Sequence, residues 1–278
     1  MAQRVAVLIH PDAMKIAGTS LKPLEVWRDD VSSDETLRFL RSIGATALRL
    51  GSGGIVREVG SRPAQTLILY EKEWCPYSRL VREALSALDL DALIKPCPDG
   101  ETLHRAELRA LCGEEQVPTL VDRTSDTQIT ESRRILEDLF ARYGSARPFP
   151  LPLRSQRFAV LSSRLASRVA GGELPFIRPS RLPEQPLELW SYEASPWSRF
   201  VRQRLGQLGL AHVSHNLARQ SPRRDAFRKR HGRVQFPFLL DPNTGVSTFE
   251  SDAICDYIDS TYGPDPTLYD AVAQPHLA

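Results

Sequence analysis

Two stretches of the chain show the same succession of hydrophobic and polar positions. The alternating apolar runs TLILYE (66–71) and LELWSY (187–192) are typical of strands. In both stretches a turn with proline follows, and apolar residues then recur at helical spacing over 76–88 and over 196–208. This pattern predicts a strand followed by a helix in each place.

The two stretches are copies of one another. An ungapped comparison of 67–90 with 187–210 gives 11 identities in 24 positions. The correspondence continues further on, where VPTLVD (117–122) becomes FPFLLD (236–241). The chain therefore contains a duplicated unit of roughly 80 residues, and each copy is preceded by an arm of its own.

The order of elements within each copy predicts an α/β fold. A strand, a helix, a variable segment with a second helix, two further strands and a closing helix fit a small mixed four-stranded sheet flanked by helices. The expected organisation is an N-terminal arm with a short helix (1–62), a first unit (63–145), a linker with a helix (146–185), a second unit (186–264) and a C-terminal tail (265–278).

Composition excludes several function classes. Lys+Arg 36 against Asp+Glu 34 leaves a net charge of +2, so no global field favours nucleic-acid binding. No apolar run is long enough for a membrane span, and the N-terminus lacks the features of a signal peptide. The basic segment SQRFAVLSSRLASRVAGG (155–172) predicts an amphipathic helix. We expect this helix to pack on a unit, and membrane contact is the alternative.

The cysteines argue against metal binding and against a disulfide framework. The chain has four of them: Cys75, Cys97, Cys112 and Cys255. They form no CxxC pair and no cluster with histidine, so we expect no metal site. A reducing, cytoplasmic location is the default for such a chain. Cys97 is expected to be an exposed loop thiol, whereas Cys112 and Cys255 lie in apolar helix contexts.

Cys75 lies between a predicted strand and a predicted helix. A helix N-terminus offers free backbone N–H groups and partial positive charge, and both favour a thiolate. Pro76 suits the first helical position, because the missing N–H costs nothing there. Lys72 adds a cation nearby. Cys75 is therefore the candidate nucleophile.

The motifs around Cys75 resemble those of the thioredoxin-like superfamily. KEWCPYS (72–78), the dipeptide VP (117–118) and TES (130–132) are most similar to glutaredoxins and to the N-terminal domain of omega-like glutathione S-transferases. The resemblance covers 67–144 and 187–263. It implies two thioredoxin-like, glutaredoxin-type domains in tandem, with glutathione as cofactor.

The resemblance also implies roles for single residues. Lys72 would contact a glutathione carboxylate, and the Val117 backbone would pair with the cysteinyl part beside a cis-proline. Glu131 and Ser132 would hold the γ-glutamyl end, although a plain helix cap is the alternative for both. The implied glutathione-binding residues are Lys72, Pro76, Tyr77, Val117, Pro118, Glu131 and Ser132.

The sequence departs from the family pattern in two respects. Ser78 replaces the second cysteine of the glutaredoxin motif, so only a monothiol cycle remains for Cys75. In addition, a second thioredoxin-like unit stands where a transferase carries an all-helical domain. In that unit Ser195 replaces the thiol and Tyr192 replaces Lys72. Its candidate site residues are Ser195, Phe236, Pro237, Glu250 and Ser251, for which glutathione binding and a scaffold role both stay open.

The leading hypothesis is a glutathione-dependent thiol-disulfide oxidoreductase or thiol transferase that uses Cys75. Its partners would be glutathione and small disulfide or protein thiol substrates. The alternative is a non-catalytic tandem module that binds glutathione or a protein. A glutathione-ligated iron–sulfur dimer ranks below both, because CPYS is not the usual glycine-rich version of such a motif.

Overall fold

The computed structural model describes residues 7–9, 33–57, 59–145, 148–171 and 177–263. The first unit contains β2 (Leu67–Glu71), α2 (Pro76–Ala87), β3 (Ala92–Pro96), α3 (Leu103–Cys112), β4 (Thr119–Asp122), β5 (Thr127–Thr130) and α4 (Ser132–Tyr143). The second unit repeats this order with β6 (Leu187–Ser191), α7 (Pro196–Gln207), β7 (His212–Asn216), α8 (Arg224–His231), β8 (Phe238–Leu240), β9 (Val246–Phe249) and α9 (Ser251–Tyr262). The remaining elements are β1 (Val7–Ile9), α1 (Ser33–Leu48), α5 (Leu151–Arg154) and α6 (Gln156–Val169).

The apolar positions that predicted the elements form the cores of the units. In the first unit Val81, Leu85 and Leu88 are buried against β2 and α4. The corresponding residues of α7 occupy the core of the second unit. The mixed α/β architecture predicted for each copy is confirmed. Among the described residues no helix is both long and apolar enough to cross a membrane.

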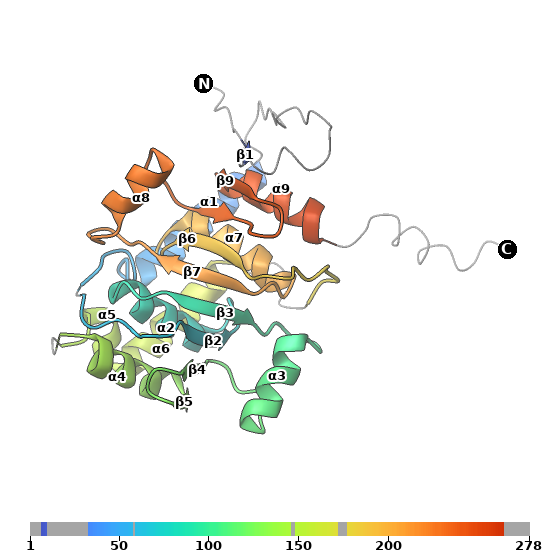
Figure 1. Ribbon diagram of the computed structural model, residues 1–278. Helices are drawn as coiled ribbons and strands as arrows, with labels where there is room; N and C mark the ends of the chain where they lie inside the picture. The colour runs from blue at the N-terminus through green and yellow to red at the C-terminus, as the bar shows by residue number, and fades with distance from the viewer. Residues whose placement is uncertain (1–6, 10–32, 58, 146–147, 172–176, 264–278) are drawn as a thin grey trace.

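The strands of both units belong to one continuous sheet (Figure 1). Its order among the described strands is β1-β9-β8-β6-β7-β3-β2-β4-β5. Within each unit one strand pair is parallel and the others are antiparallel. The units meet where β3 pairs antiparallel with β7, with Ala92 opposite Ser214 and Ile94 opposite His212. The two predicted four-stranded sheets are therefore joined edge to edge.

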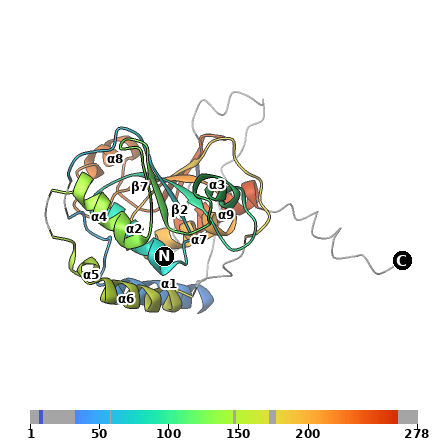
Figure 2. The ribbon, with the colours of Figure 1, turned by 90° about the horizontal axis from the view of Figure 1, so that it is seen from below.

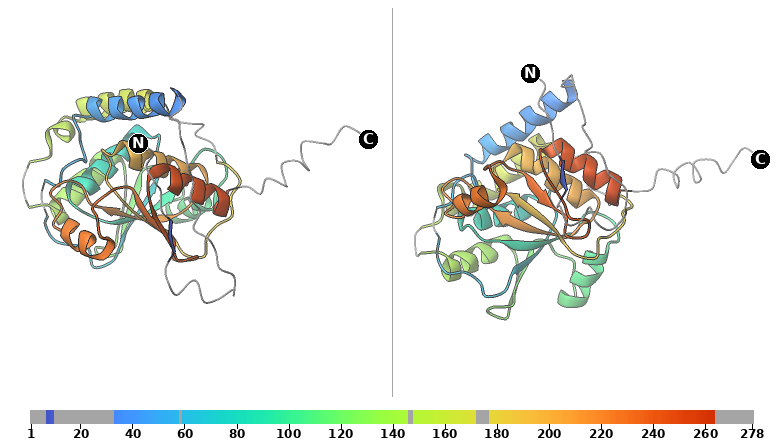
Figure 3. Two further views of the ribbon diagram at one scale, coloured as in Figure 1. Left: turned by 90° about the horizontal axis from the view of Figure 1, so that it is seen from above. Right: turned by 45° about the horizontal axis from the view of Figure 1, so that its top comes forward.

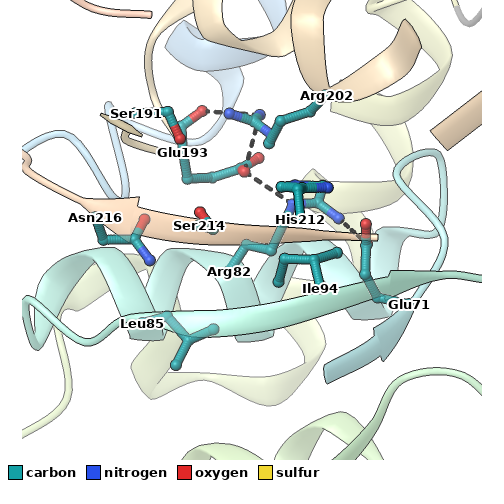
Figure 4. Close-up of a pocket in the computed structure, with 10 residues that line it drawn as sticks. All are labelled: Glu71, Arg82, Leu85, Ile94, Ser191, Glu193, Arg202, His212, Ser214 and Asn216. Atoms are coloured by element: carbon teal, nitrogen blue, oxygen red, sulfur yellow. Dashed lines mark hydrogen bonds and ion pairs between the residues drawn. The ribbon is translucent and has the colours of Figure 1, made fainter. Parts of the chain in front are cut away.

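A buried cluster of charged residues lies between α2 and α7 (Figure 4). Arg82 Nε donates to Glu193 Oε2 at 2.9 Å, and Arg202 Nε donates to Glu73 Oε2 at 3.1 Å. These two bonds correspond to each other in the repeat, so the interface has an approximate two-fold relation. Arg82 also binds Glu71, and a small cavity lies within the cluster. The glutamates and arginines that are identical in the two copies therefore hold the two units together.

The two arm helices, α1 and α6, lie side by side as a layer against α2 and α7 (Figure 2). Helix α6 precedes the second unit but packs on α2 of the first, where Ser163 Oγ donates to the Pro76 carbonyl at 2.7 Å. Helix α1 precedes the first unit but packs on α7 of the second, where Ser42 Oγ donates to the Pro196 carbonyl at 3.4 Å. Each unit is therefore covered by the arm that the chain places before the other unit.

Equivalent arginines tie each exchanged arm to its unit. Arg199 donates to the Ser42 carbonyl at 2.7 Å and to Thr46 Oγ1 at 3.3 Å. Its counterpart Arg79 donates to Ser167 Oγ at 3.3 Å. Both guanidinium groups are buried, and burial lowers their pKa values. The hydroxyl and carbonyl groups of the arms supply part of the hydrogen bonding that these buried groups need.

Candidate functional site: a thiol at the start of α2

The sheet register gathers the predicted motifs at one end of the first unit. Strand β2 pairs antiparallel with β4, with Tyr70 opposite Thr119, and β4 pairs with β5, with Thr119 opposite Thr130. The motifs just beyond these pairs are Cys75, Val117–Pro118 and Glu131–Ser132. The end of β2, the start of β4 and the end of β5 lie at the same edge, so the three motifs are neighbours.

Cys75 is the N-cap residue of α2, and its side chain is half-buried. Its N–H donates to the Lys72 carbonyl at 2.8 Å, and its carbonyl accepts from the Arg79 N–H at 3.1 Å. The thiol itself makes no capping hydrogen bond to the helix. The backbone therefore holds the sulfur at the positive end of the helix while the sulfur stays available for chemistry.

The other cysteines are poorer nucleophiles. Burial raises the pKa of the Cys97 thiol and that of the Cys255 thiol to about 12. It also raises the pKa of Cys112, which accepts a hydrogen bond from Gln128. The prediction that Cys97 is an exposed loop thiol is wrong. Its N–H extends the sheet bonding by donating to the Glu71 carbonyl at 2.7 Å, and its side chain packs in an apolar cluster.

The candidate carboxylate-binding lysine is paired within the protein. Lys72 Nζ lies 2.5 Å and 2.6 Å from the two carboxylate oxygens of Asp99, and Arg105 Nη2 lies 3.6 Å from the same carboxylate. The pair is partly exposed. A ligand carboxylate can therefore reach Lys72 only by sharing it with Asp99 or by displacing Asp99.

The remaining motifs predicted to bind glutathione have the same geometry in both units. The Val117–Pro118 and Phe236–Pro237 peptide bonds are cis, as the resemblance implied for the first. Glu131 precedes α4 with φ 71°, and Glu250 precedes α9 with φ 72°. Such values are uncommon for residues other than glycine and persist only where the surrounding structure imposes them.

Glutamine side chains bind both of these glutamates. Gln116 Nε2 donates to Glu131 Oε1 at 2.8 Å, and Gln235 binds Glu250 in the same way. Ser132 and Ser251 are buried at the helix starts. Because the second unit keeps these features although Ser195 replaces the thiol at its helix start, they belong to the common scaffold and do not by themselves mark the reactive site.

Helix α6 of the exchanged arm reaches the residues that follow Cys75. Ser163 holds the Pro76 carbonyl, and Arg164 Nη2 donates to Tyr77 Oη at 2.7 Å. Sequence reasoning missed Arg164. The signal was weak, because the arms share little sequence and the residue at the matching position of α1 is Ile43. Arg164 places a cation on the arm side of the thiol site.

The second unit uses its serine as a helix cap. Ser195 is buried, and its Oγ accepts from the Ser198 N–H at 3.2 Å. Tyr192 packs edge-on against Phe236, and the Arg224 guanidinium lies 5.2 Å from the centre of the Phe236 ring. Tyrosine, phenylalanine and arginine thus fill the region that corresponds to Lys72 and its surroundings. Within the described part of the chain no group of three or more metal-ligating side chains could hold an ion.

The chain matches one known family twice. The family model described as glutathione S-transferase, N-terminal domain, matches residues 69–147 and again 189–266, together more than half of the chain. No curated protein and no solved structure matches the sequence. The two matches coincide with the two structural units, and they support a glutathione-related thiol function in general.

Proposed function

We propose a function for the first of two tandem copies in this chain, which belongs to the glutathione S-transferase N-terminal domain family. The first copy is a glutathione-dependent thiol-disulfide oxidoreductase or thiol transferase. One observation carries the proposal. At equivalent helix starts, the first copy has the uncapped thiol of Cys75, whereas the second copy has the buried, capping hydroxyl of Ser195. The scaffold is shared, and a thiol at this helix start belongs to one copy alone.

The reaction is a monothiol exchange with two steps. The Cys75 thiolate attacks the glutathione sulfur of a mixed disulfide, a Cys75–glutathione disulfide forms, and the substrate leaves as a thiol. A second glutathione thiolate then attacks that disulfide, which releases oxidised glutathione and restores the Cys75 thiolate. The mixed disulfide and one glutathione thiol thus give the substrate thiol and oxidised glutathione, so one glutathione molecule is consumed for each substrate thiol released. Ser78 stands at the position of a resolving cysteine, so the second thiol must come from solution.

The neighbouring residues would bind glutathione. The Val117 backbone beside Pro118 would pair with its cysteinyl part, and Glu131 and Ser132 would hold the γ-glutamyl end. Lys72, once it exchanges its Asp99 partner, would bind the glycine carboxylate.

The surroundings of the thiol would complete the site. Pro76 and Tyr77 would line it, with Arg164 beside Tyr77. Such a cycle needs a compartment that supplies reduced glutathione, which agrees with the cytoplasm. The substrates would be small disulfides or glutathionylated protein thiols.

Mass spectrometry of the intact chain tests the proposal. After incubation with oxidised glutathione, we expect one glutathione adduct, which the Cys75→Ser variant should lose. Cys112→Ser is the matched control, since Cys112 is also half-buried, and it should keep the adduct. Turnover would be measured in a glutathione reductase-coupled assay with a small mixed disulfide. A wild-type chain without an adduct at Cys75 would show that the proposed function is wrong.

A further inference from the structure

The most buried residues of the arm helix α6 are small, whereas three of its large apolar residues are exposed. Ala159, Ser163 and Ala166 face the first unit and are almost fully buried. Leu161 is 71 % exposed, and Phe158 and Leu165 are also exposed. A helix packed on a core normally does the reverse, because burying large apolar side chains supplies most of the stabilisation.

Helix α1 has the same inverted pattern. Ser42 and Ala45 are buried against the second unit, whereas Leu40 is 57 % exposed and Leu37 and Ile43 are exposed too. The exposed residues of each helix recur at intervals of three or four, so they form one stripe along the helix. The sequence pattern predicts a helix here, but it does not reveal that the large apolar side is the outer side.

The exposed residues of the two stripes lie on neighbouring helices, and we call them the arm layer: Leu37, Leu40, Ile43, Phe158, Leu161 and Leu165. The helices run alongside each other as an outer layer of the molecule (Figure 3). They approach closely, because a Cβ on Gly44 would lie 3.3 Å from Val169 Cγ1. Large apolar patches on a protein surface mark sites that contact another protein or a membrane.

The charged residues within the two stripes, 37–43 and 158–165, are all arginines. Neither 36–57 nor 139–172 contains an aspartate or a glutamate, although the whole chain has a net charge of only +2. Arg41, Arg157 and Arg168 are exposed on the two helices. Helix α1 has acidic residues only in its first turn, Asp34 and Glu35, and α6 has none. Exposed leucine and phenylalanine beside arginine are features of helices that lie in a membrane interface.

We infer that the arm layer docks the protein on an anionic membrane surface. The apolar stripes would enter the boundary between headgroups and acyl chains, while the arginines would pair with anionic headgroups. A second copy of the chain fits less well, because two such surfaces would bring arginines together, and the acidic residues of the two helices are confined to the first turn of α1. This inference does not depend on the thiol chemistry proposed for Cys75.

Vesicle co-sedimentation of the full chain tests the inference. The probes are vesicles of phosphatidylcholine alone and of phosphatidylcholine with phosphatidylserine. Wild type should bind the anionic vesicles, and added salt should release it. Leu161→Glu should abolish binding, whereas Leu103→Glu should retain it, since Leu103 is 62 % exposed on α3 and lies outside the arm layer. The combined variant Arg157→Gln with Arg168→Gln should bind at least about tenfold more weakly, since each arginine near an anionic surface contributes about fivefold.

The same experiment distinguishes the alternatives. Both leucines are largely exposed, so their variants should keep the wild-type melting temperature, which confirms that they fold. Wild type that does not bind anionic vesicles overturns the inference, and so does equal loss of binding in Leu103→Glu. Light scattering that finds a wild-type dimer, broken by Leu161→Glu, would instead assign the arm layer to a second copy.

Discussion

The Glu193→Gln variant tests whether the buried charges between the units stabilise the fold. Glutamine has the shape of glutamate, so the change removes a charge without making a cavity. Glu193 Oε2 lies 2.9 Å from Arg82 Nε and 3.0 Å from Arg202 Nη2. Both arginine side chains are at most 6 % exposed, so water cannot replace the lost carboxylate. The variant therefore leaves two buried guanidinium groups short of negative charge.

The expected loss of unfolding free energy follows from this burial. Removing one partner of a buried ion pair costs about 3–5 kcal/mol, whereas an exposed helical pair contributes about 0.3–0.5 kcal/mol. Glu137→Gln is the matched control, because Glu137 pairs with Arg133 at 2.7 Å on the exposed side of α4. Small proteins are stable by about 5–15 kcal/mol, so Glu193→Gln should remove a large share and Glu137→Gln almost none.

Urea unfolding at neutral pH measures both variants. Burial alone would raise the pKa of Glu193, but the guanidinium groups of Arg202 and Arg82 outweigh burial and hold this pKa well below its usual range. A carboxylate with a lowered pKa contributes stability above its unfolded-state pKa, and that stability is lost as the pH falls through the folded-state pKa. The difference between wild type and variant should therefore shrink in acid. A loss below about 1 kcal/mol at neutral pH, or an equal loss in Glu137→Gln, would refute the reasoning.

Three further predictions concern other parts of the molecule. Burial raises the pKa of Glu71 from 4.5 to about 7 and outweighs the effect of Arg82. Between these pH values the folded state binds a proton that the unfolded state does not, so wild-type stability should fall as the pH rises from about 4.5 to about 7. The urea midpoint of Glu71→Gln should fall less over the same range. Ala166→Leu should cost about 1–3 kcal/mol through overpacking, whereas Leu161→Ala should cost less than about 0.5 kcal/mol; equal melting temperatures would contradict the inverted packing of α6. Arg164→Gln should slow the reaction of Cys75 with an anionic aromatic disulfide about tenfold and leave the reaction with a neutral disulfide unchanged. The control Arg157→Gln, two turns earlier on α6, should change neither rate. Stopped-flow absorbance measures the rates, and equal slowing with both disulfides would show that Arg164 does not recognise charge.

Local sequence was sufficient for the elements and for the position of the thiol. Strand and helix periods depend on neighbours within a few residues, so Val81, Leu85 and Leu88 predicted α2 directly. The cysteine follows the strand and precedes a proline, which fixes it at the helix start. The assembly of the motifs at one sheet edge needed the resemblance to known folds, because register is a property of paired strands.

Contacts between the two halves could not be predicted from the same patterns. Strand β3 lies at the edge of the first unit taken alone, and its apolar and polar positions would alternate in the same way whether its neighbour were water or β7. The repeat identified Arg82 and its counterpart Arg202 as conserved between the copies, but not that each binds the glutamate of the other copy. The pattern of apolar positions predicts each arm helix but does not show on which of the two units that helix packs. Cys97 was misplaced for a similar reason, since its burial comes from a helix that packs over the loop.

The exchanged arms give the two halves the organisation of a dimer within a single chain. In a homodimer every substitution appears twice, because one sequence serves both subunits. Here the arm that covers Cys75 and the arm that covers Ser195 are encoded separately, so each surrounding can change without altering the other. One half is then free to specialise in chemistry while the other keeps the structure that both require. One polypeptide can therefore keep the same scaffold in both halves and still have different residues at the two helix starts.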